Sequence, residues 1–320
     1  MQTGCFYGEG EMKVKVFDAH CDVLWQLWSA KGKKNFQNDP SLHITFEQLE
    51  QRKGSVQCFA IYAPEIVPYE QRFEATLAMI DIFYKQILSL PNMKLIQTKK
   101  DITQLESNEI GAILTLEGGE AIGKEMMKLR TLYRLGVRSM GLTWNHANLL
   151  ADGALETRGA GLTAFGKKVV EELNSFRLWT DVSHLNEKGF WDVMEIAQYP
   201  IASHSNCYGL CQHPRNLKDE QVQALIQKDG VIGVTFVPEF LTNHRPAYMD
   251  DILRHVERIC SLGGERNIGF GSDFDGITEM VVGVEAYRRY EYVINELSKR
   301  YSETNVQSFL YDNFINHISF

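Results

Sequence analysis

Eight short apolar runs alternate with amphipathic stretches along this chain. They cover residues 14–18, 56–62, 111–117, 137–144, 178–183, 200–204, 231–236 and 267–273. Each run is rich in β-branched or aromatic residues and lacks clean polar alternation, which is typical of strands buried on both faces. Strands that alternate with helices predict a parallel sheet. Eight of them predict a closed (β/α)8 barrel, the TIM barrel fold, built as a single domain.

The stretches between the runs have helical periodicity. Apolar side chains recur every three or four positions in residues 120–135, 162–176 and 249–262. The first of these stretches is followed by Gly136, a residue type that commonly ends helices. Asn186 precedes another periodic stretch and is expected to cap its first turn.

Net charge and cysteine content indicate which binding partners and which cellular compartment to expect. The net charge of −8 comes without a compensating basic block, so neither nucleic acid nor an anionic membrane is expected as a partner. Six cysteines in 320 residues show no framework spacing, which predicts free thiols in a reducing compartment. Residues 1–13 read as a polar N-terminal tail without a secretory core, and residues 14–320 as the barrel. We therefore expect a cytoplasmic protein.

Side chains that can bind metal ions follow the predicted strands. At or just after the ends of six of the eight runs the sequence places His20 and Asp22, Glu117, His146, His184, His204, and Asp273. In a (β/α)8 barrel the C-terminal ends of the strands form the rim where active sites are built. One histidine at a strand end would mean little, but this repetition predicts a metal-dependent hydrolase.

His20 and Asp22 are separated by one residue. Side chains with this spacing at a strand end point the same way, so both can reach one ion. Imidazole together with carboxylate suits zinc or another first-row divalent ion. The alternative for such a pair is a histidine that is hydrogen-bonded to its neighbour's backbone.

Glu117 follows a wholly apolar stretch, where an unpaired carboxylate is costly to bury. A metal ion or an arginine would have to neutralise it. His184 and His204 each close a short hydrophobic strand, and either one alone would be interpreted as a core histidine. Their corresponding places on adjacent strands favour metal ligation. Together these residues predict two ions about 3.5–4 Å apart that share Glu117 and a hydroxide.

Asp273 lies between glycines in the segment 269–276 and is the candidate acid for proton transfer, with Asp275 as the alternative. Cys21 is a possible nucleophile, but in a strand its side chain points away from its neighbours, which favours packing. A zinc knuckle formed by residues 204–213 is disfavoured, because the order His, Cys, Cys, His departs from the usual paired spacing.

The strand-end segments together resemble a known family. They are Phe-Asp-Ala-His-Cys-Asp at 17–22, Leu-Glu-Gly-Gly at 116–119, Leu-Thr-Trp-Asn-His at 142–146, Asp-Val-Ser-His at 181–184, Ser-His-Ser at 203–205 and Gly-Phe-Gly-Ser-Asp-Phe-Asp-Gly at 269–276. This set resembles the membrane (renal) dipeptidase family, peptidase family M19 of the amidohydrolase superfamily, from about residue 14 to the end.

The resemblance implies a dinuclear zinc dipeptidase. By this analogy His20 and Asp22 hold one Zn²⁺, His184 and His204 hold the other, and Glu117 bridges them. The substrates would be dipeptides, often with a D-residue at the C-terminal position, and the protein would be a homodimer.

Three further roles follow from the resemblance. Asp273 matches the family's proton-transfer acid, and His146 matches a histidine that contacts the substrate and the developing oxyanion. Arg215 matches the arginine that binds the dipeptide carboxylate, a task for which the planar guanidinium fork is suited.

Two other functions stay open at this point. Related amidohydrolases hydrolyse lactones, N-acyl amino acids or phosphotriesters, usually with a modified lysine on the fourth strand as bridge, whereas the bridge candidate here is Glu117 on the third. A barrel that kept its metal ligands and lost activity is the other alternative. The presence of Asp273 and Arg215 argues against it.

Overall fold

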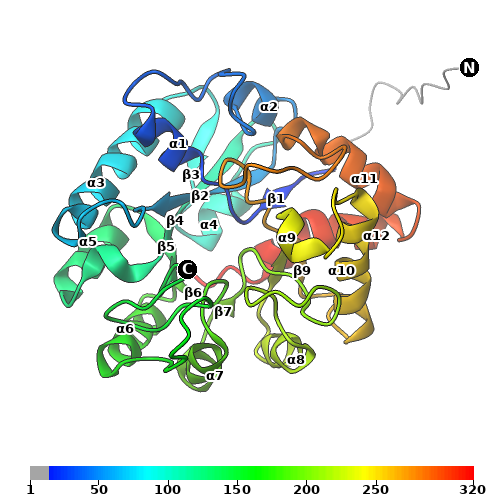
Figure 1. Cartoon of the computed structure of the whole chain (residues 1–320). Coiled ribbons are helices and arrows are strands. Elements are labelled where there is room, and N and C mark those ends of the chain that lie inside the picture. Colours follow the sequence, from blue (N-terminus) through cyan, green and yellow to red (C-terminus); the bar gives the residue numbers. More distant parts are fainter. Residues whose placement is uncertain (1–13) are drawn as a thin grey trace, which may run out of the picture.

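The computed structural model of the chain describes residues 14–320, so the predicted tail at 1–13 lies outside the described residues. Eight parallel strands follow one another around a barrel (Figure 1). They are β1 (Phe17–Asp18), β2 (Val56–Tyr62), β4 (Ile110–Glu117), β5 (Val137–Gly141), β6 (Trp179–Asp181), β7 (Pro200–Ile201), β8 (Ile232–Val234) and β9 (Ile268–Phe270). A parallel bridge between Ala202 and Ile232 joins β7 to β8 and closes the ring. The predicted TIM barrel is confirmed.

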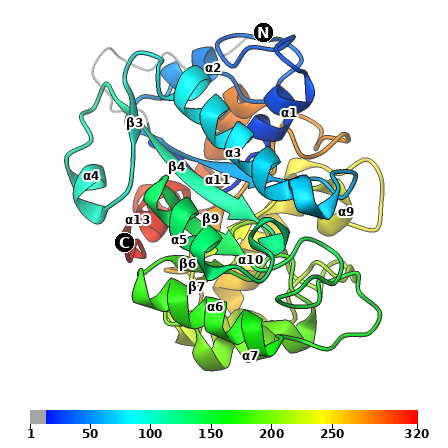
Figure 2. The ribbon, with the colours of Figure 1, turned by 90° about the vertical axis from the view of Figure 1, so that its left-hand side faces the viewer.

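Helices alternate with these strands along the chain, and most of them lie around the outside of the barrel (Figures 1 and 2). They are α1 (Val23–Ser29), α2 (Phe46–Glu50), α3 (Arg72–Ile82), α4 (Lys99–Thr103), α5 (Met126–Arg134), α6 (Ala164–Ser175), α7 (Glu187–Ile196), α8 (Asp219–Gln227), α9 (Pro238–Leu241), α10 (Met249–Ser261), α11 (Tyr290–Ser298), α12 (Glu303–Gln307) and α13 (Asn313–Asn316). Within residues 14–320, no helix combines the length and the apolar character that crossing a membrane requires.

The strand and helix predictions differ from the structure in detail. One strand was not predicted: β3 (Met93–Leu95) pairs with β4 outside the ring. The helix expected over 120–135 is two elements, a 3-10 turn at Gly119–Ile122 and then α5, because Gly123 between them has φ of +57°. Gly136 does end α5, with φ of +109°. Asn186 does cap α7, and its side chain accepts a hydrogen bond from Gly189 N.

The C-terminal segment covers the end of the barrel away from the strand tips (Figure 2). Phe314 in α13 stacks on Phe17 of β1 with ring centroids 4.8 Å apart. Trp179 of β6 packs against the Phe314 ring, and its Nε1 donates a hydrogen bond to His317 O at 3.1 Å. All three rings are almost fully buried. This apolar floor leaves the opposite mouth as the open face of the barrel.

Candidate active site

The end of β1 brings one group of ligand atoms together. His20 and Asp22 leave the strand in succession, and Asp273 approaches from the segment after β9, where its backbone N–H donates to His20 O at 3.2 Å. His20 Nε2 lies 3.5 Å from Asp22 Oδ2 and 3.8 Å from Asp273 Oδ1. Neither His20 Nε2 nor Asp22 Oδ1 has a hydrogen-bond partner, although both are buried. Buried nitrogen and oxygen atoms that have no hydrogen-bond partner and converge on one point are suited to binding a cation.

His184 and His204 form the second group, from the segments after β6 and β7. Their Nε2 atoms are 2.9 Å apart. Burial, together with the positive charges of Arg215 for His184 and of His20 for His204, lowers the pKa of both imidazoles well below the ordinary value. Both histidines are therefore neutral at physiological pH, the form that binds metal ions.

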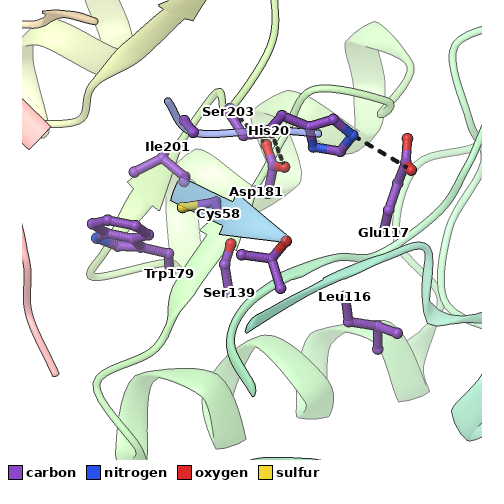
Figure 3. Close-up of a pocket in the computed structure, with 11 residues that line it drawn as sticks. His20, Cys58, Leu116, Glu117, Ser139, Trp179, Asp181, Ile201 and Ser203 are labelled. Carbon is purple, nitrogen blue, oxygen red and sulfur yellow. Dashed lines mark hydrogen bonds and ion pairs between the residues drawn. The ribbon is translucent and has the colours of Figure 1, made fainter. Parts of the chain in front are cut away.

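Glu117, the last residue of β4, faces both groups. Its Oε2 lies 3.6 Å from His20 Nε2, and its Oε1 lies 2.8 Å from His184 Nε2 and 3.8 Å from His204 Nε2. Figure 3 shows the carboxylate aimed at His20. One carboxylate with an oxygen toward each ligand group has the arrangement of a bridging ligand. The five predicted metal ligands thus lie in one cluster.

The charge balance of the cluster also calls for cations. Burial and the neighbouring Glu117 raise the pKa of Asp22, and burial and Asp22 raise the pKa of Asp273 well above its ordinary value. Three acidic side chains share this small volume, and bound cations would relieve their repulsion. A tetrahedral ion holds its ligand atoms roughly 3.3 Å apart, close to the 3.5–3.6 Å separations around His20. The residues present fit a divalent metal site.

Two aspartates follow β9, and only one faces the cluster. Both have a left-handed backbone, with φ of +65° at Asp273 and +68° at Asp275, which aspartate tolerates better than most residues. Asp275 turns away, because its oxygens accept hydrogen bonds from His43 N at 2.8 Å and Ile44 N at 3.2 Å. A Cβ atom on Gly276 would lie 2.1 Å from Asp22 Oδ2 and 2.6 Å from Asp273 Oδ1, so any larger residue would displace these two carboxylates. Between the two aspartates, geometry favours Asp273 as the proton-transfer acid.

A cleft of about 470 Å³ opens from this cluster to the surface. Aromatic side chains line one wall, with Trp144 and Tyr62 rings 5.1 Å apart and Trp25 beyond Tyr62. Arg215 and Phe240 line the cleft as well, and the guanidinium lies 5.2 Å from the ring centroid. Strand-end motifs do not reveal these cleft residues, because their contact depends on how separate loops pack.

Arg215 is 3% exposed, and Nη2 donates to His184 Nε2 at 3.1 Å. Its Nε and Nη1 have no hydrogen-bond partner. Burial lowers the pKa of Arg215 to about 10, which leaves the side chain cationic at neutral pH. A buried guanidinium cation with N–H groups free on two nitrogens is suited to an anion such as a carboxylate.

His146 lies on the loop after β5 and is exposed. It is not among the described residues that line the cleft, whereas its neighbour Asn145 is. Asn145 Oδ1 lies 2.9 Å from His184 Nδ1. The carbonyl oxygen only accepts, so this bond places the Nδ1 proton and leaves Nε2 unprotonated. The substrate contact assigned to His146 stays a prediction, and Asn145 is a functional candidate that the sequence interpretation missed.

The cysteines among residues 14–320 take no part in the cluster. The Cys21 thiol donates to Cys58 O at 3.3 Å, away from the neighbouring ligands, as expected. Cys207 contacts His255 O and Cys211 contacts Glu239 O, so the two thiols bind different backbone groups. No zinc knuckle forms among the described residues 204–213.

A parallel eight-stranded barrel with histidine and carboxylate ligands gathered at its strand ends defines a metal-dependent hydrolase of the amidohydrolase superfamily. The family model of membrane dipeptidases, peptidase family M19, matches residues 11–318, and the chain belongs to this family. It is therefore a metal-dependent dipeptidase.

Individual proteins and solved structures are also similar to this chain. An uncharacterised Klebsiella pneumoniae protein from the pqqA 5′ region is 35% identical over 219 residues, which are 62% of this chain and 81% of that protein. The crystal structure of dipeptidase AC, an M19 metallopeptidase, superimposes with a TM-score of 0.88 at 27% identity, over 96% of this chain and 98% of that one. A Rhodobacter sphaeroides metallopeptidase, solved with a phosphinate mimic of L-Ala-D-Ala, shares the fold with a TM-score of 0.87 at 24% identity, over 96% and 99% of the two chains.

Proposed function

We propose that the chain hydrolyses the amide bond of dipeptides with two divalent first-row ions, Zn²⁺ foremost, at the cluster described above. The carrying observation is Glu117, whose two oxygens face separate ligand groups. His20 and Asp22 would hold one ion, and His184 and His204 the other. When bound, the two ions supply Lewis acidity and lower the pKa of the attacking water, which reacts as hydroxide.

The chain's own residues bind the substrate and move protons. Arg215 binds the C-terminal carboxylate through its guanidinium, two nitrogens of which, Nε and Nη1, have no partner in the protein, and this contact fixes the amide bond over the cluster. Asp273 accepts the proton of the attacking water and gives it to the leaving amine. His146, on the loop after β5, would reach the developing oxyanion when substrate is bound.

The cleft can also distinguish dipeptides by parts other than the C-terminal carboxylate and the amide bond. In line with the family resemblance, we propose that dipeptides with a D-residue at the C-terminal position are among the substrates. Arg215 recognises the carboxylate, which both stereoisomers present. The aromatic wall of Trp25, Tyr62 and Trp144 then contacts the remaining side chain.

Metal removal combined with a substrate panel tests this proposal. The enzyme is stripped with chelator, titrated with Zn²⁺, Mn²⁺ or Co²⁺, and assayed on L-L and L-D dipeptides and on N-acyl amino acids. We expect turnover of dipeptides to disappear on stripping and to recover as about two ions per chain return. Turnover that survives complete metal removal would refute the mechanism. Faster turnover of N-acyl amino acids would shift the substrate class.

We also propose a reducing, cytoplasmic location and a homodimer. The five cysteines among residues 14–320 are all free, which suits a reducing compartment. The homodimer rests on the family resemblance alone. Fractionation of cells and light scattering of the purified protein test the two statements separately.

A further inference from the structure

A buried carboxylate lies beneath the second ligand group and contacts none of the proposed metal ligands directly. Asp181 is the last residue of β6 and is 9% exposed. Its Oδ1 accepts hydrogen bonds from Ser183 N at 3.0 Å, Ser183 Oγ at 2.7 Å and Ser203 N at 3.0 Å. Its Oδ2 accepts a hydrogen bond from Ser203 Oγ (Figure 3). The carboxylate thus ties together the segments that carry His184 and His204.

The hydrogen atoms of these hydroxyls can be assigned from the bonds. An ionised carboxylate only accepts, so Ser183 and Ser203 both spend their single hydroxyl hydrogen on Asp181. Ser203 Oγ is also 2.7 Å from His204 Nδ1. Because the serine has no second hydrogen, His204 must be the donor in this contact. The bonds therefore run in one direction, from His204 Nδ1–H to Ser203 Oγ–H to the carboxylate.

This direction decides which ring nitrogen of His204 keeps its lone pair. With the proton on Nδ1, Nε2 points its lone pair at His184 Nε2, 2.9 Å away, which also lacks a proton because Arg215 donates to it. The opposite tautomer would relieve that contact by an Nε2–H bond. In that tautomer, however, His204 Nδ1 would have no proton, and its lone pair would face a lone pair of Ser203 Oγ at 2.7 Å. The carboxylate favours the first arrangement, in which a cation between the two Nε2 atoms removes the repulsion.

The first ligand group has a matching arrangement. Asp18, the last residue of β1, accepts hydrogen bonds from Ser272 N at 2.9 Å and Ser272 Oγ at 2.7 Å. Ser272 directly precedes Asp273, as Ser203 directly precedes His204. The same arrangement therefore occurs twice. A buried aspartate at the end of one strand accepts hydrogen bonds from a serine after the neighbouring strand, and that serine directly precedes a residue of the site. Two such occurrences in one barrel argue against an incidental contact.

We propose that Asp181, acting through Ser203, is a positioning residue that fixes His204 in the Nδ1–H tautomer, so that Nε2 presents its lone pair to the metal site. This inference rests on the proposed metal cluster for its purpose, but the tautomer itself is a property of the metal-free protein. Hydrogen bonds of this kind to the second nitrogen of a metal-binding histidine orient the ring and raise ligand affinity.

The tautomer is measured by long-range ¹H–¹⁵N NMR on metal-free, ¹⁵N-histidine-labelled protein, with the His204 signal assigned by its loss in His204→Asn. We expect His204 of the natural sequence to carry its proton on Nδ1. In Ser203→Ala, Nδ1 loses its acceptor, and the population should move toward the Nε2–H form. Ser183→Ala is the comparison variant, because it removes an equally buried hydroxyl from the same carboxylate but keeps Ser203 as the acceptor for His204 Nδ1. It also removes the hydrogen bond from His204 N at 3.1 Å and the 3.2 Å contact with Ser203 Oγ, so the position of the ring proton is the readout that separates the two variants.

Asp181→Asn gives a sharper test with little change in shape. An amide NH₂ in place of Oδ2 donates to Ser203, whose hydroxyl is then free to donate to His204 Nδ1. The direction of the bonds is reversed, and His204 should switch to the Nε2–H form although every side chain stays nearly isosteric. Circular dichroism confirms that the variants fold.

Metal affinity is the second readout, by competition with a chromophoric chelator. Ser203→Ala and Asp181→Asn should weaken one of two Zn²⁺ sites by about 10–100-fold, and Ser183→Ala should weaken it much less. Either of two results overturns the inference: an Nε2–H tautomer in the natural sequence, or equal tautomers and affinities in Ser203→Ala and Ser183→Ala. The expected tautomers in a protein that hydrolyses no dipeptide would leave this inference standing and remove the proposed function instead.

Discussion

Replacing Arg215 by methionine tests how the substrate is held. The side chain is buried, and its Nε and Nη1 have no partner in the protein. A guanidinium binds a carboxylate with two N–H groups on one edge of its plane, and each such charged hydrogen bond contributes about 1.5–3 kcal/mol. Losing both removes about 3–6 kcal/mol of substrate binding. At about 1.4 kcal/mol per factor of ten, kcat/KM for dipeptides should fall by roughly 10²–10⁴-fold. Methionine keeps the aliphatic packing beside Phe240 without the charge.

The assay compares each dipeptide with its C-terminal amide. For the natural enzyme, kcat/KM should be lower on the amide than on the dipeptide by most of this factor, because the amide lacks the carboxylate. Arg215→Met should discriminate little between acid and amide, since the interacting group is already gone. Metal content is measured in parallel, because Arg215 also donates to His184. An equal loss on acid and amide substrates in Arg215→Met would refute carboxylate recognition by this residue.

Three further predictions concern proton transfer, pH and the floor of the barrel. Asp273→Asn should keep two ions and lower kcat by about 10²–10⁴-fold; a fully active variant would require another base. Burial lowers the pKa of His255 to about 4. As the pH falls, the unfolded chain therefore binds a proton at His255 before the folded protein does, and the unfolding free energy should decrease by about 2 kcal/mol between pH 7.5 and pH 5. In His255→Gln, urea titrations should show a smaller loss of unfolding free energy over this pH range. An equal dependence of unfolding free energy on pH in both proteins would contradict the prediction. Phe314→Ala should cost about 3–5 kcal/mol, measured in the same way, and an unchanged midpoint would exclude the floor as a stabilising unit.

The barrel could be predicted because its eight strands are apolar on both faces. The residues at which the strands end could not be predicted, because β5 stops at Gly141 and β7 at Ile201 although the apolar runs continue beyond them. The residues after these points leave the sheet to form the rim. The strand β3 was missed because it has three residues, of which only Met93 is buried. Burial of one side chain in three leaves no periodicity to detect.

The cluster of histidines and carboxylates could be predicted because such a residue at the end of an apolar strand is unusual and is repeated. The residues that support them could not. Asn145 and Ser203 are ordinary polar residues in sequence, and their importance comes from the atoms that they contact across neighbouring strands. Such contacts depend on the register between strands, which a single sequence does not contain.

The short first strand links the two ends of the barrel. Phe17 is stacked on Phe314 at the floor, and His20 lies only three residues further along the chain at the opposite mouth. A disturbance of α13 can therefore reach the proposed metal ligands through a short stretch of chain. Weakened packing of the last helix should appear first as metal leakage and faster amide exchange in β1, before the rest of the barrel unfolds. Inactivation during storage or mild heating would then begin at the end of the molecule that no substrate touches.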